Sequence, residues 1–342
     1  MRVAVTGASG FIGSSLCRSL ANDGHEPIAV VRASSRLDRL EGAGSQLFVA
    51  DLGSQGSLVK AFAGADAVVH CAAVVDPYAN PWEARSTNFI AAFNVCHAAS
   101  DAGVEHIVQM STAAVYSRSN RRGVPLLEDH ATIIEDPPVY DTYSINKAAA
   151  EKVVMDFGRG GRLQASVIRP GAVYGTGDRF SGPLAAAIKA NRMCVIGSRG
   201  LRLPLIHIDD LVSAVTGLLS HPPHAARAFN VDGPTPTTFG AYLDALAATL
   251  DLAVELRTVP IAAARAAAWA SETWWNIGKR DGPAPLNRFA VELIAADFVL
   301  DTSRIRTELG WSPTVKLDDG VRSLRNWLQS EELPAAALPI PA

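Results

Sequence analysis

Residues 3–22 read VAVTGASGFIGSSLCRSLAN and join a short β-branched run to a helical pattern through three glycines. The pattern predicts a strand over residues 2–5 and a helix over residues 12–22. In this G-x-x-G-x-x-G spacing, the first glycine permits a tight turn, the second lets the backbone approach a phosphate, and the third lets the helix pack on the strand. The free N–H groups at the start of the helix favour a pyrophosphate. The residues that we expect to contact a dinucleotide cofactor here are Gly7, Ser9, Gly10, Phe11, Ile12 and Gly13.

Strands and helices alternate along the first half of the chain. Further strands are predicted over residues 27–31, 46–50, 66–71, 107–111 and 165–168, and helices over residues 57–63, 86–102 and 144–157. This alternation is typical of an α/β protein. It predicts a Rossmann-type, doubly wound parallel sheet with both faces covered by helices.

The alternation breaks after Pro170, where glycine and proline become frequent, and helices predominate from Phe239 onward. Residues 205–220 and a predicted strand over residues 228–231 still have the character of the sheet domain. We therefore expect interleaved domains, which are a dinucleotide-binding domain over residues 1–173 and 205–235 and a smaller, mostly helical substrate cap over residues 174–204 and 236–330. The Pro/Ala-rich residues 331–342 are expected to form a flexible tail.

The composition narrows the range of partners. The 342 residues are 48% hydrophobic and 19% charged, with a net charge of −3, as in an ordinary globular protein. Without a basic excess, nucleic acid is not an expected partner. The four cysteines are scattered without CxxC spacing, and no uncharged apolar run has the length of a membrane-spanning helix. We expect a cytoplasmic protein with buried, reduced thiols and no membrane partner. No metal is expected either, because His207, Asp209 and Asp210 open a predicted helix that an aspartate can cap.

The end of the second strand bears on the choice of cofactor. Val31 and Arg32 stand where a carboxylate would bind the ribose hydroxyls of NAD. A guanidinium followed by two serines and Arg36 suits a 2′-phosphate, so the sequence favours NADP. NAD remains the alternative if Arg32 only stacks on the adenine. Asp51 and Leu52, after the third strand, are expected to contact the adenine, although Asp51 could instead cap a turn.

An acid–base pair is predicted on a helix. Tyr143 and Lys147 are four residues apart in YSINK, which places both side chains on one helix face. An ammonium beside a phenol stabilises the phenolate, so we expect Lys147 to lower the pKa of Tyr143. Thr112 ends a predicted strand at the sheet edge where ligands bind, and its hydroxyl could hold a substrate oxygen beside Tyr143 or simply cap a turn.

These motifs occur together and in order, and the chain resembles the extended short-chain dehydrogenase/reductase family from Met1 to about Trp327. The matching blocks are TGASGFIG, VVHCAA, STAAVY, YSINK, IRPGAVYGTGD and LIHIDDL. The resemblance implies catalysis by Thr112, Tyr143 and Lys147. It also implies cofactor contacts by Ala72 and Ala73, a nicotinamide near Pro170 and Val173, and a position near the active site for Asn88, which could otherwise be an ordinary polar helix residue.

Several members of that family are disfavoured by residues that this chain lacks. Sugar-nucleotide dehydratases carry Asp-Glu after the strand-end threonine, where this chain has Ala113 and Ala114. Sugar-nucleotide epimerases usually have a diphosphate-binding Asn where this chain has Ala172. They also often have an Arg where Leu203 stands, with Arg202 one position away.

The blocks RPGAVYGTGD and LPLIHIDD are instead similar to the 3β-hydroxysteroid dehydrogenase and dihydroflavonol reductase branch. This resemblance implies an NADP-dependent ketone or aldehyde reductase, or hydroxy-substrate dehydrogenase, that transfers hydride to or from a hydrophobic substrate with Tyr143 as general acid/base. A nucleotide-sugar 4-epimerase and a non-catalytic NADP-binding regulator are the alternatives. The aromatic residues that we expect to face an apolar substrate are Tyr78, Trp82, Phe180, Trp274, Trp275 and Phe289.

A homodimer is also expected. The predicted helices over residues 88–102 and 144–157 have Ala-rich faces. In the family that the chain resembles, these two helices commonly pair across a two-fold axis, which makes an isologous interface. The alternative is that these faces are buried within one chain.

Overall fold

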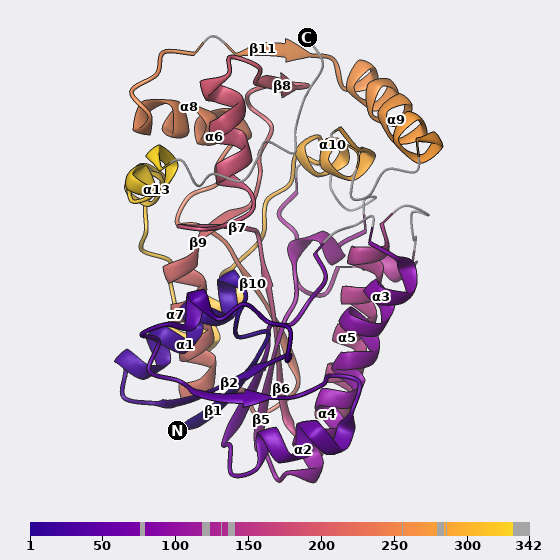
Figure 1. Cartoon of the computed structure of the whole chain (residues 1–342), viewed down its shortest axis with the longest axis vertical. Helices are drawn as coiled ribbons and strands as arrows, with labels where there is room; N and C mark the ends of the chain where they lie inside the picture. The colour runs from indigo at the N-terminus through magenta and orange to yellow at the C-terminus, as the bar shows by residue number, and fades with distance from the viewer. Residues whose placement is uncertain are drawn as a thin grey trace.

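The computed structural model describes residues 1–75, 79–117, 124–130, 132–135, 141–254, 256–278, 284 and 286–330. Its centre is a parallel sheet of seven strands (Figure 1). The strands are β1 (Arg2–Thr6), β2 (Glu26–Val31), β3 (Gln46–Val49), β4 (Ala67–His70), β5 (His106–Met110), β6 (Gln164–Pro170) and β10 (Arg227–Val231). They lie in the order β10-β6-β5-β4-β1-β2-β3, so the sheet is doubly wound from β1 and β4 outward.

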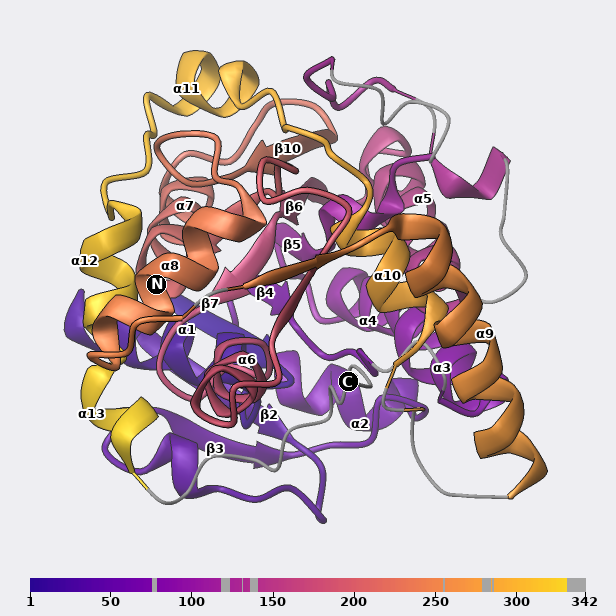
Figure 2. The same cartoon turned by 90° about the horizontal axis from the view of Figure 1, so that it is seen from above.

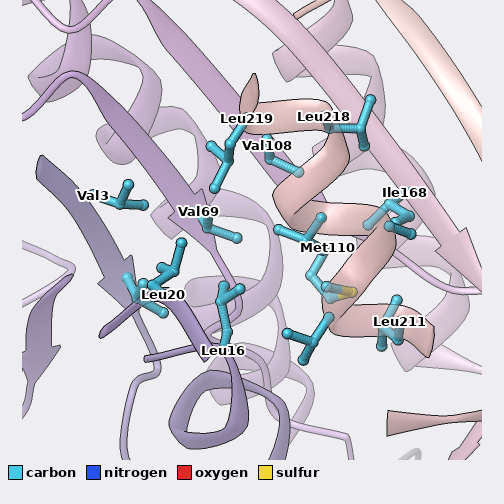
Figure 3. Close-up of a cluster of buried hydrophobic side chains, with 14 of the residues drawn as sticks. Val3, Leu16, Leu20, Val69, Val108, Met110, Ile168, Leu211, Leu218 and Leu219 are labelled. Carbon is cyan, nitrogen blue, oxygen red and sulfur yellow. The ribbon is translucent and has the colours of Figure 1, made fainter. Parts of the chain in front are cut away.

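Helices cover both faces of the sheet. On one face lie α1 (Phe11–Asn22) and α7 (Ile208–Ser220), which contact each other. Figure 3 shows Leu16 and Leu20 of α1 and Leu218 of α7 around sheet residues such as Val69 and Met110. The opposite face is covered by α2 (Gln55–Phe62), α4 (Ala91–Asp101) and α5 (Thr142–Arg159). Because both faces are covered, the central strands β1 and β4 are almost wholly buried and mostly apolar.

The sequence predicts one helix over residues 86–102, but the structure of this segment is more complex. It begins earlier, with α3 (Pro81–Arg85), and passes through a π-helical turn, η2 (Ser86–Ile90), before α4. Most alanines of α4 are buried against α2, α5 and the sheet of the same chain. The Ala-rich face is therefore buried within one chain.

A second difference concerns residues 205–220. Their helical part is α7, but β9 (Leu205–His207) is not a strand of the main sheet, because it pairs with β7 (Ala172–Tyr174) in a small two-stranded sheet. The predicted strand over residues 228–231 does belong to the main sheet, as β10 beside β6.

The remaining elements gather mostly at one end of the sheet, where they form a cap (Figures 1 and 2). The cap elements are α6 (Ser181–Lys189), β8 (Cys194–Ile196), α8 (Phe239–Thr249), β11 (Arg257–Val259), α9 (Ile261–Ile277), α10 (Arg288–Ile294), α12 (Leu317–Arg322) and α13 (Arg325–Gln329). The short elements η1 (Asp38–Leu40), η3 (Ala113–Val115), η5 (Ile133–Glu135) and α11 (Ser303–Leu309) lie in the connections. The domain boundaries stay a prediction, and the expected tail at residues 331–342 lies outside the described residues. Within the described ranges, no helix is both long and apolar enough to cross a membrane.

Candidate active site

The glycine turn is shaped to receive a phosphate. Gly7 has φ +68°, and a Cβ there would lie 2.6 Å from the backbone nitrogen of Ala72. A Cβ on Gly13 would lie 2.4 Å from the carbonyl oxygen of Gly7. No side chain caps the start of α1, whose N-cap is Gly10. The first N–H groups of the helix are thus left to a ligand, and the residues of the turn fit a dinucleotide pyrophosphate.

One cavity of about 1190 Å³ runs from this turn to the cap. All but one of the residues that the sequence predicts for catalysis and cofactor binding line it. They are Gly7, Ser9, Gly10, Phe11, Ile12, Gly13, Arg32, Arg36, Asp51, Leu52, Ala72, Ala73, Thr112, Tyr143, Pro170 and Val173. The exception is Lys147, which is buried behind the wall.

After the end of β2, Arg32 and Arg36 differ in whether the side chain forms an ion pair. The Arg36 guanidinium forms an exposed ion pair with Asp38 at 2.6 Å. The backbone N–H of Arg32 donates to the Ser35 hydroxyl at 3.0 Å, and its exposed side chain forms no ion pair within the described part of the chain. Arg32 is therefore the arginine whose charge is available to a 2′-phosphate. Asp51 lines the cavity and also accepts the Gly53 N–H at 2.9 Å, so it caps a turn as well.

Thr112 and Tyr143 meet at the cavity wall. Thr112 is the N-cap of η3 and accepts the Ala114 N–H at 3.2 Å. Burial raises the pKa of Tyr143 to about 12, although its side-chain hydrogen bond with Thr112 lowers it. The phenol is thus protonated at neutral pH and hydrogen-bonded to the Thr112 side chain.

Lys147 is 2% exposed, and its ammonium donates a hydrogen bond to the carbonyl oxygen of Met110. Burial lowers its pKa to about 8, while Cys71 and Glu151 act in the opposite direction. Lys147 is not among the groups that shift the pKa of Tyr143, and its ammonium contacts Met110 instead. The expected support of the Tyr143 phenolate by Lys147 therefore stays a prediction. Local spacing places both residues on one face of α5, but it does not show where each side chain points.

A buried polar network lies beside the site. The Arg169 guanidinium donates to the Glu151 carboxylate at 2.6–3.1 Å, to the Tyr116 hydroxyl at 3.1 Å and to the Glu128 carbonyl at 2.9 Å. The Tyr116 hydroxyl donates to Asn230 at 2.5 Å. Arg169 opens the RPGAVYG block, but its partners are within the protein. Its interactions hold α5 against β6 and the segment before residue 130.

Asn88 has a structural partner. Its amide donates to the Val74 carbonyl at 2.8 Å and accepts the Val74 N–H at 2.7 Å, as a neighbouring strand would. It is 1% exposed and does not line the cavity. Asn88 therefore fixes the segment after β4, in which Ala72, Ala73 and Val74 form part of the cavity wall.

The cap side of the cavity is mostly apolar. Phe180 and Phe289 line it as expected, but among the described residues no tryptophan does so. The prediction that Trp82 and Trp274 face the substrate is wrong, since they are 69% and 59% exposed and do not line the cavity. Trp275 is also absent from the cavity wall. Tyr78 lies outside the described residues. The wall residues that the sequence analysis did not predict include Cys71, Val74, Val75, Ser111, Arg179, Leu293 and Phe298.

Two positions bear on sugar-nucleotide chemistry. Ala172 and Leu203 line the cavity at the places where the epimerase pattern has diphosphate-binding residues. The neighbouring Arg202 does not reach the cavity, because its guanidinium is paired with Asp297 at 2.9 and 3.0 Å.

The histidine–aspartate segment after β9 also has internal partners. The Asp209 N–H donates to the His207 ring nitrogen Nδ1 at 3.3 Å. Asp210 accepts the N–H groups of Thr314 and Val315 at 2.9 and 3.0 Å. In the portion of the chain that the structure describes, no group of His, Cys, Asp and Glu side chains could hold a metal ion.

Comparison with known proteins agrees with this geometry. Residues 3–232 match the model of the NAD dependent epimerase/dehydratase family. A 4-hydroxy-2-methyl-3-oxo-4-farnesyl-3,4-dihydroquinoline-1-oxide ketoreductase from Stigmatella aurantiaca is 29% identical over 327 residues, covering 95% of this chain and 96% of that protein. A UDP-glucose 4-epimerase from Vibrio cholerae is 26% identical over 341 residues, covering 94% and 93%. A UDP-glucose 4-epimerase from Thermotoga maritima, solved with UDP-glucose, is 20% identical with a TM-score of 0.75, covering 96% of this chain and 99% of that one, and it shares the fold.

The family match spans the glycine turn, the Thr112–Tyr143 pair and the sheet up to β10. The chain therefore belongs to the NAD-dependent epimerase/dehydratase family, that is, the extended short-chain dehydrogenases/reductases, and it is an NAD(P)-dependent enzyme of that type.

Proposed function

We propose that the protein is an NADP-dependent oxidoreductase that reduces the carbonyl of a hydrophobic ketone or aldehyde, or oxidises the corresponding alcohol. The observation that carries this proposal is that one cavity joins the glycine turn, the hydrogen-bonded Thr112–Tyr143 pair and a largely apolar cap wall. An apolar wall favours an apolar substrate. The Stigmatella aurantiaca relative is named for reduction of a farnesyl-bearing oxo compound, which supports the same substrate class.

The chain's own residues divide the work of the reaction. When bound, NADPH supplies the hydride for the carbonyl carbon. Tyr143 gives its phenolic proton to the carbonyl oxygen as negative charge develops there, and its raised pKa keeps that proton in place at neutral pH. Thr112 hydrogen-bonds the same oxygen and orients it. Lys147 uses one of its three donors on Met110, which leaves donors for the nicotinamide ribose and for the developing phenolate.

The preference for NADP rests on Arg32. Among the basic residues after β2 that line the cavity, Arg36 is already paired with Asp38, whereas Arg32 forms no ion pair with a described residue. The 2′-phosphate of NADP would supply the missing anion, and a charge-assisted bond of that kind typically contributes about 1.5–3 kcal/mol. Pro170 and Val173 line the cavity where the nicotinamide would lie.

A nucleotide-sugar 4-epimerase is less well supported. Ala172 and Leu203 offer no charge or amide to a diphosphate, and Arg202 is held by Asp297. The presence of both Tyr143 and Lys147 argues against a regulator without turnover. The Vibrio cholerae relative is nonetheless a UDP-glucose 4-epimerase, so nucleotide sugars belong among the test substrates.

The test is NADPH oxidation against a panel of apolar ketones, aldehydes and nucleotide sugars, repeated with Tyr143→Phe. We expect turnover of apolar ketones or aldehydes and a loss of about 10²–10⁴ in rate in the variant, because the proton donor is gone. NADPH affinity should stay within a few fold. Tyr174→Phe, at a buried tyrosine that does not line the cavity, is the matched control and should keep its rate. Retention of most activity by Tyr143→Phe would contradict the catalytic assignment.

We also infer a cytoplasmic homodimer. Since the alanines of α4 are buried within the chain, the outward side of α4 and α5 is the surface that supports the dimer. An aromatic cluster lies there, with the Phe93 and His97 ring centroids 4.4 Å apart and those of His97 and Phe157 4.8 Å apart. Phe93 is 45% exposed. Sedimentation at micromolar concentration should give a dimer mass that Phe93→Ser reduces to a monomer mass, and a monomer of the unchanged protein would remove the proposal.

A further inference from the structure

Arg179 is a basic residue that lines the cavity from the segment between β7 and α6. The residue is exposed, and its guanidinium forms no hydrogen bond or ion pair with the part of the chain that the structure describes. The other basic residues of the described cavity wall, Arg32 and Arg36, both follow β2. An unpaired guanidinium in a largely apolar wall is suited to an anionic group of a ligand.

The backbone around Arg179 is fixed by the carboxylate of Asp178. This carboxylate accepts the N–H of Gly175 at 2.8 Å, that of Phe180 at 2.7 Å and that of Ser181 at 2.6 Å. Asp178 is 3% exposed, so the turn that it holds is buried. Because backbone N–H groups occupy the carboxylate, it fixes the position from which the Arg179 side chain extends without pairing with its charge.

The same segment lies against the start of α1, where the glycine turn ends. A Cβ on Gly175 would lie 3.0 Å from the ring of Phe11, the first residue of α1. The Arg39 guanidinium donates to the Gly177 carbonyl at 2.6 Å and lies 6.0 Å from the centroid of the Phe11 ring. Gly175 and Gly177 are therefore held near the glycine turn, one directly and the other through Arg39. Arg179 follows two residues later on the wall of the same cavity.

We propose that Arg179 binds the pyrophosphate of the dinucleotide cofactor from the cap side. The glycine turn offers this anion N–H groups and the partial positive charge of a helix end, but no charged side chain. A guanidinium supplies a full charge and paired donors that match phosphate oxygens. The inference does not depend on the proposed function, because NAD and NADP share the pyrophosphate.

An anionic group of the substrate is the other ligand that Arg179 could meet. The pyrophosphate is favoured because the residues just before Arg179 contact the start of α1. The cap residues of the wall near the expected substrate position, such as Phe180, Leu203 and Phe289, are instead apolar. They offer no polar partner to an anion held beside them.

The contact would join two parts of the molecule through the cofactor. The glycine turn follows β1 of the central sheet, whereas Arg179 directly precedes α6, which stands in the cap (Figure 1). The hydroxyl of Ser181, at the start of α6, lies 2.6 Å from that of Tyr242 on α8, so this turn is continuous with the interior of the cap. Bound cofactor would therefore restrain α6 as well as the glycine turn.

The test is the binding of cofactors and their fragments to Arg179→Met, measured by calorimetry. The dissociation constants of NADPH, NADH and ADP-ribose, which all contain a pyrophosphate, should rise by roughly tenfold or more, because a charge-assisted hydrogen bond is lost. Adenosine 2′-phosphate has no pyrophosphate, and its dissociation constant should not change. Arg179→Lys keeps the charge without the paired donors and should recover part of the affinity.

Two further variants serve as controls. Arg192→Met removes an exposed arginine just after α6 that does not line the cavity, and it should leave all these constants unchanged. Arg32→Ala should give a different pattern, weakening NADPH and adenosine 2′-phosphate and sparing NADH and ADP-ribose. If Arg32→Ala lacks that pattern, the preference for NADP fails, and the constants of NADH and ADP-ribose still decide the role of Arg179.

The inference is overturned if Arg179→Met leaves the dissociation constants of NADH and ADP-ribose unchanged. A rise confined to NADPH and adenosine 2′-phosphate would also overturn it and assign Arg179 to the 2′-phosphate. A rise only in the KM of an acidic ketone would overturn it and assign Arg179 to the substrate.

Hydrogen exchange tests the link between the cofactor and the cap. At saturating NADH, the amides of α6 should exchange more slowly than in the free protein, and this protection should be smaller in Arg179→Met. Equal protection of α6 in the two proteins would contradict the link.

Discussion

Lys147 and Arg169 are two buried cations on neighbouring elements, and the fold gives them opposite surroundings: one has a carboxylate partner and the other does not. Arg169 is 6% exposed and paired with Glu151, and the charge and hydrogen bonds of Glu151 raise its pKa despite the opposing effect of burial. Lys147 is 2% exposed and, within the described chain, has no carboxylate at ion-pair distance, so burial lowers its pKa to about 8. We therefore expect the loss of its partner to destabilise the fold at Arg169, and we propose that Lys147, which has only the Met110 carbonyl as a partner, serves a ligand.

The sharpest test of this contrast is Lys147→Met. Turnover should fall by about 10²–10⁴, because the residue supports both the proton donor and the cofactor ribose. Tm should remain within a few degrees, since the folded chain gives up a charge that burial already disfavours. Kinetics, NADPH titration and thermal unfolding together check this outcome. A large loss of Tm with normal turnover of the remaining folded protein would reverse the roles assigned to the two cations.

The reciprocal change is Glu151→Gln, which leaves the Arg169 charge buried without its anion. Breaking such a pair typically costs about 3–5 kcal/mol of unfolding free energy. Urea denaturation should show this loss, while kcat at low temperature changes little. Asp156→Asn on the same helix is the control, because its exposed pairs with Lys152 and Arg159 should each contribute only about 0.3–0.5 kcal/mol. Equal losses of unfolding free energy in Glu151→Gln and Asp156→Asn would contradict the distinction between a buried and an exposed ion pair.

Arg32 extends the comparison of the two buried cations to an exposed one. Arg32→Ala should weaken NADPH binding by roughly tenfold or more, the equivalent of about 1.5–3 kcal/mol, and affect NADH much less. Arg36→Ala should have a smaller effect, since Arg36 is engaged by Asp38. The measurement is the dissociation constant of NADPH and of NADH for the unchanged protein and for each variant. Equal constants for NADPH and NADH in the unchanged protein would contradict the preference for NADP.

The smallest effect is a pH dependence. Because the pKa of Lys147 is lowered to about 8, its ammonium form declines above that pH, and kcat/KM for NADPH should fall by half near pH 8 and further beyond it. Folding stability should move the other way, rising from about pH 8 towards the ordinary pKa of lysine, because the unfolded chain then holds more protons. Lys147→Arg, which stays charged, should remove this limb of the rate profile.

Local spacing explains what could be predicted from the sequence. The strand–turn–helix around Gly7, Gly10 and Gly13 depends on neighbouring residues, as does the placement of Thr112 and Tyr143 at strand and helix ends. These features are where the sequence places them. The pattern of alternating strands likewise predicts the parallel sheet, because strands buried on both faces are recognisable one at a time.

What could not be predicted depends on contacts between distant segments. Asn88 pairs with Val74 through a π-helical turn that periodicity does not show. Phe289 reaches the cavity and Trp274 does not, although both lie in helical segments of the cap, because helix packing alone decides which face turns inward. The direction of the Lys147 ammonium depends in the same way on Met110, which lies 37 positions earlier in the chain.

The late position of β10 in the chain has a consequence for synthesis. β10 pairs with β6, and Val231 lies opposite Pro170, about sixty residues later in the chain. While the ribosome makes the intervening segment, at about 5–20 residues per second, β6 stays an open sheet edge for roughly 3–12 s. An open, apolar edge invites pairing with other nascent chains. During this interval the open edge of β6 is a site that a chaperone can protect. The interval ends when Asn230 forms its hydrogen bond in the buried network around Tyr116.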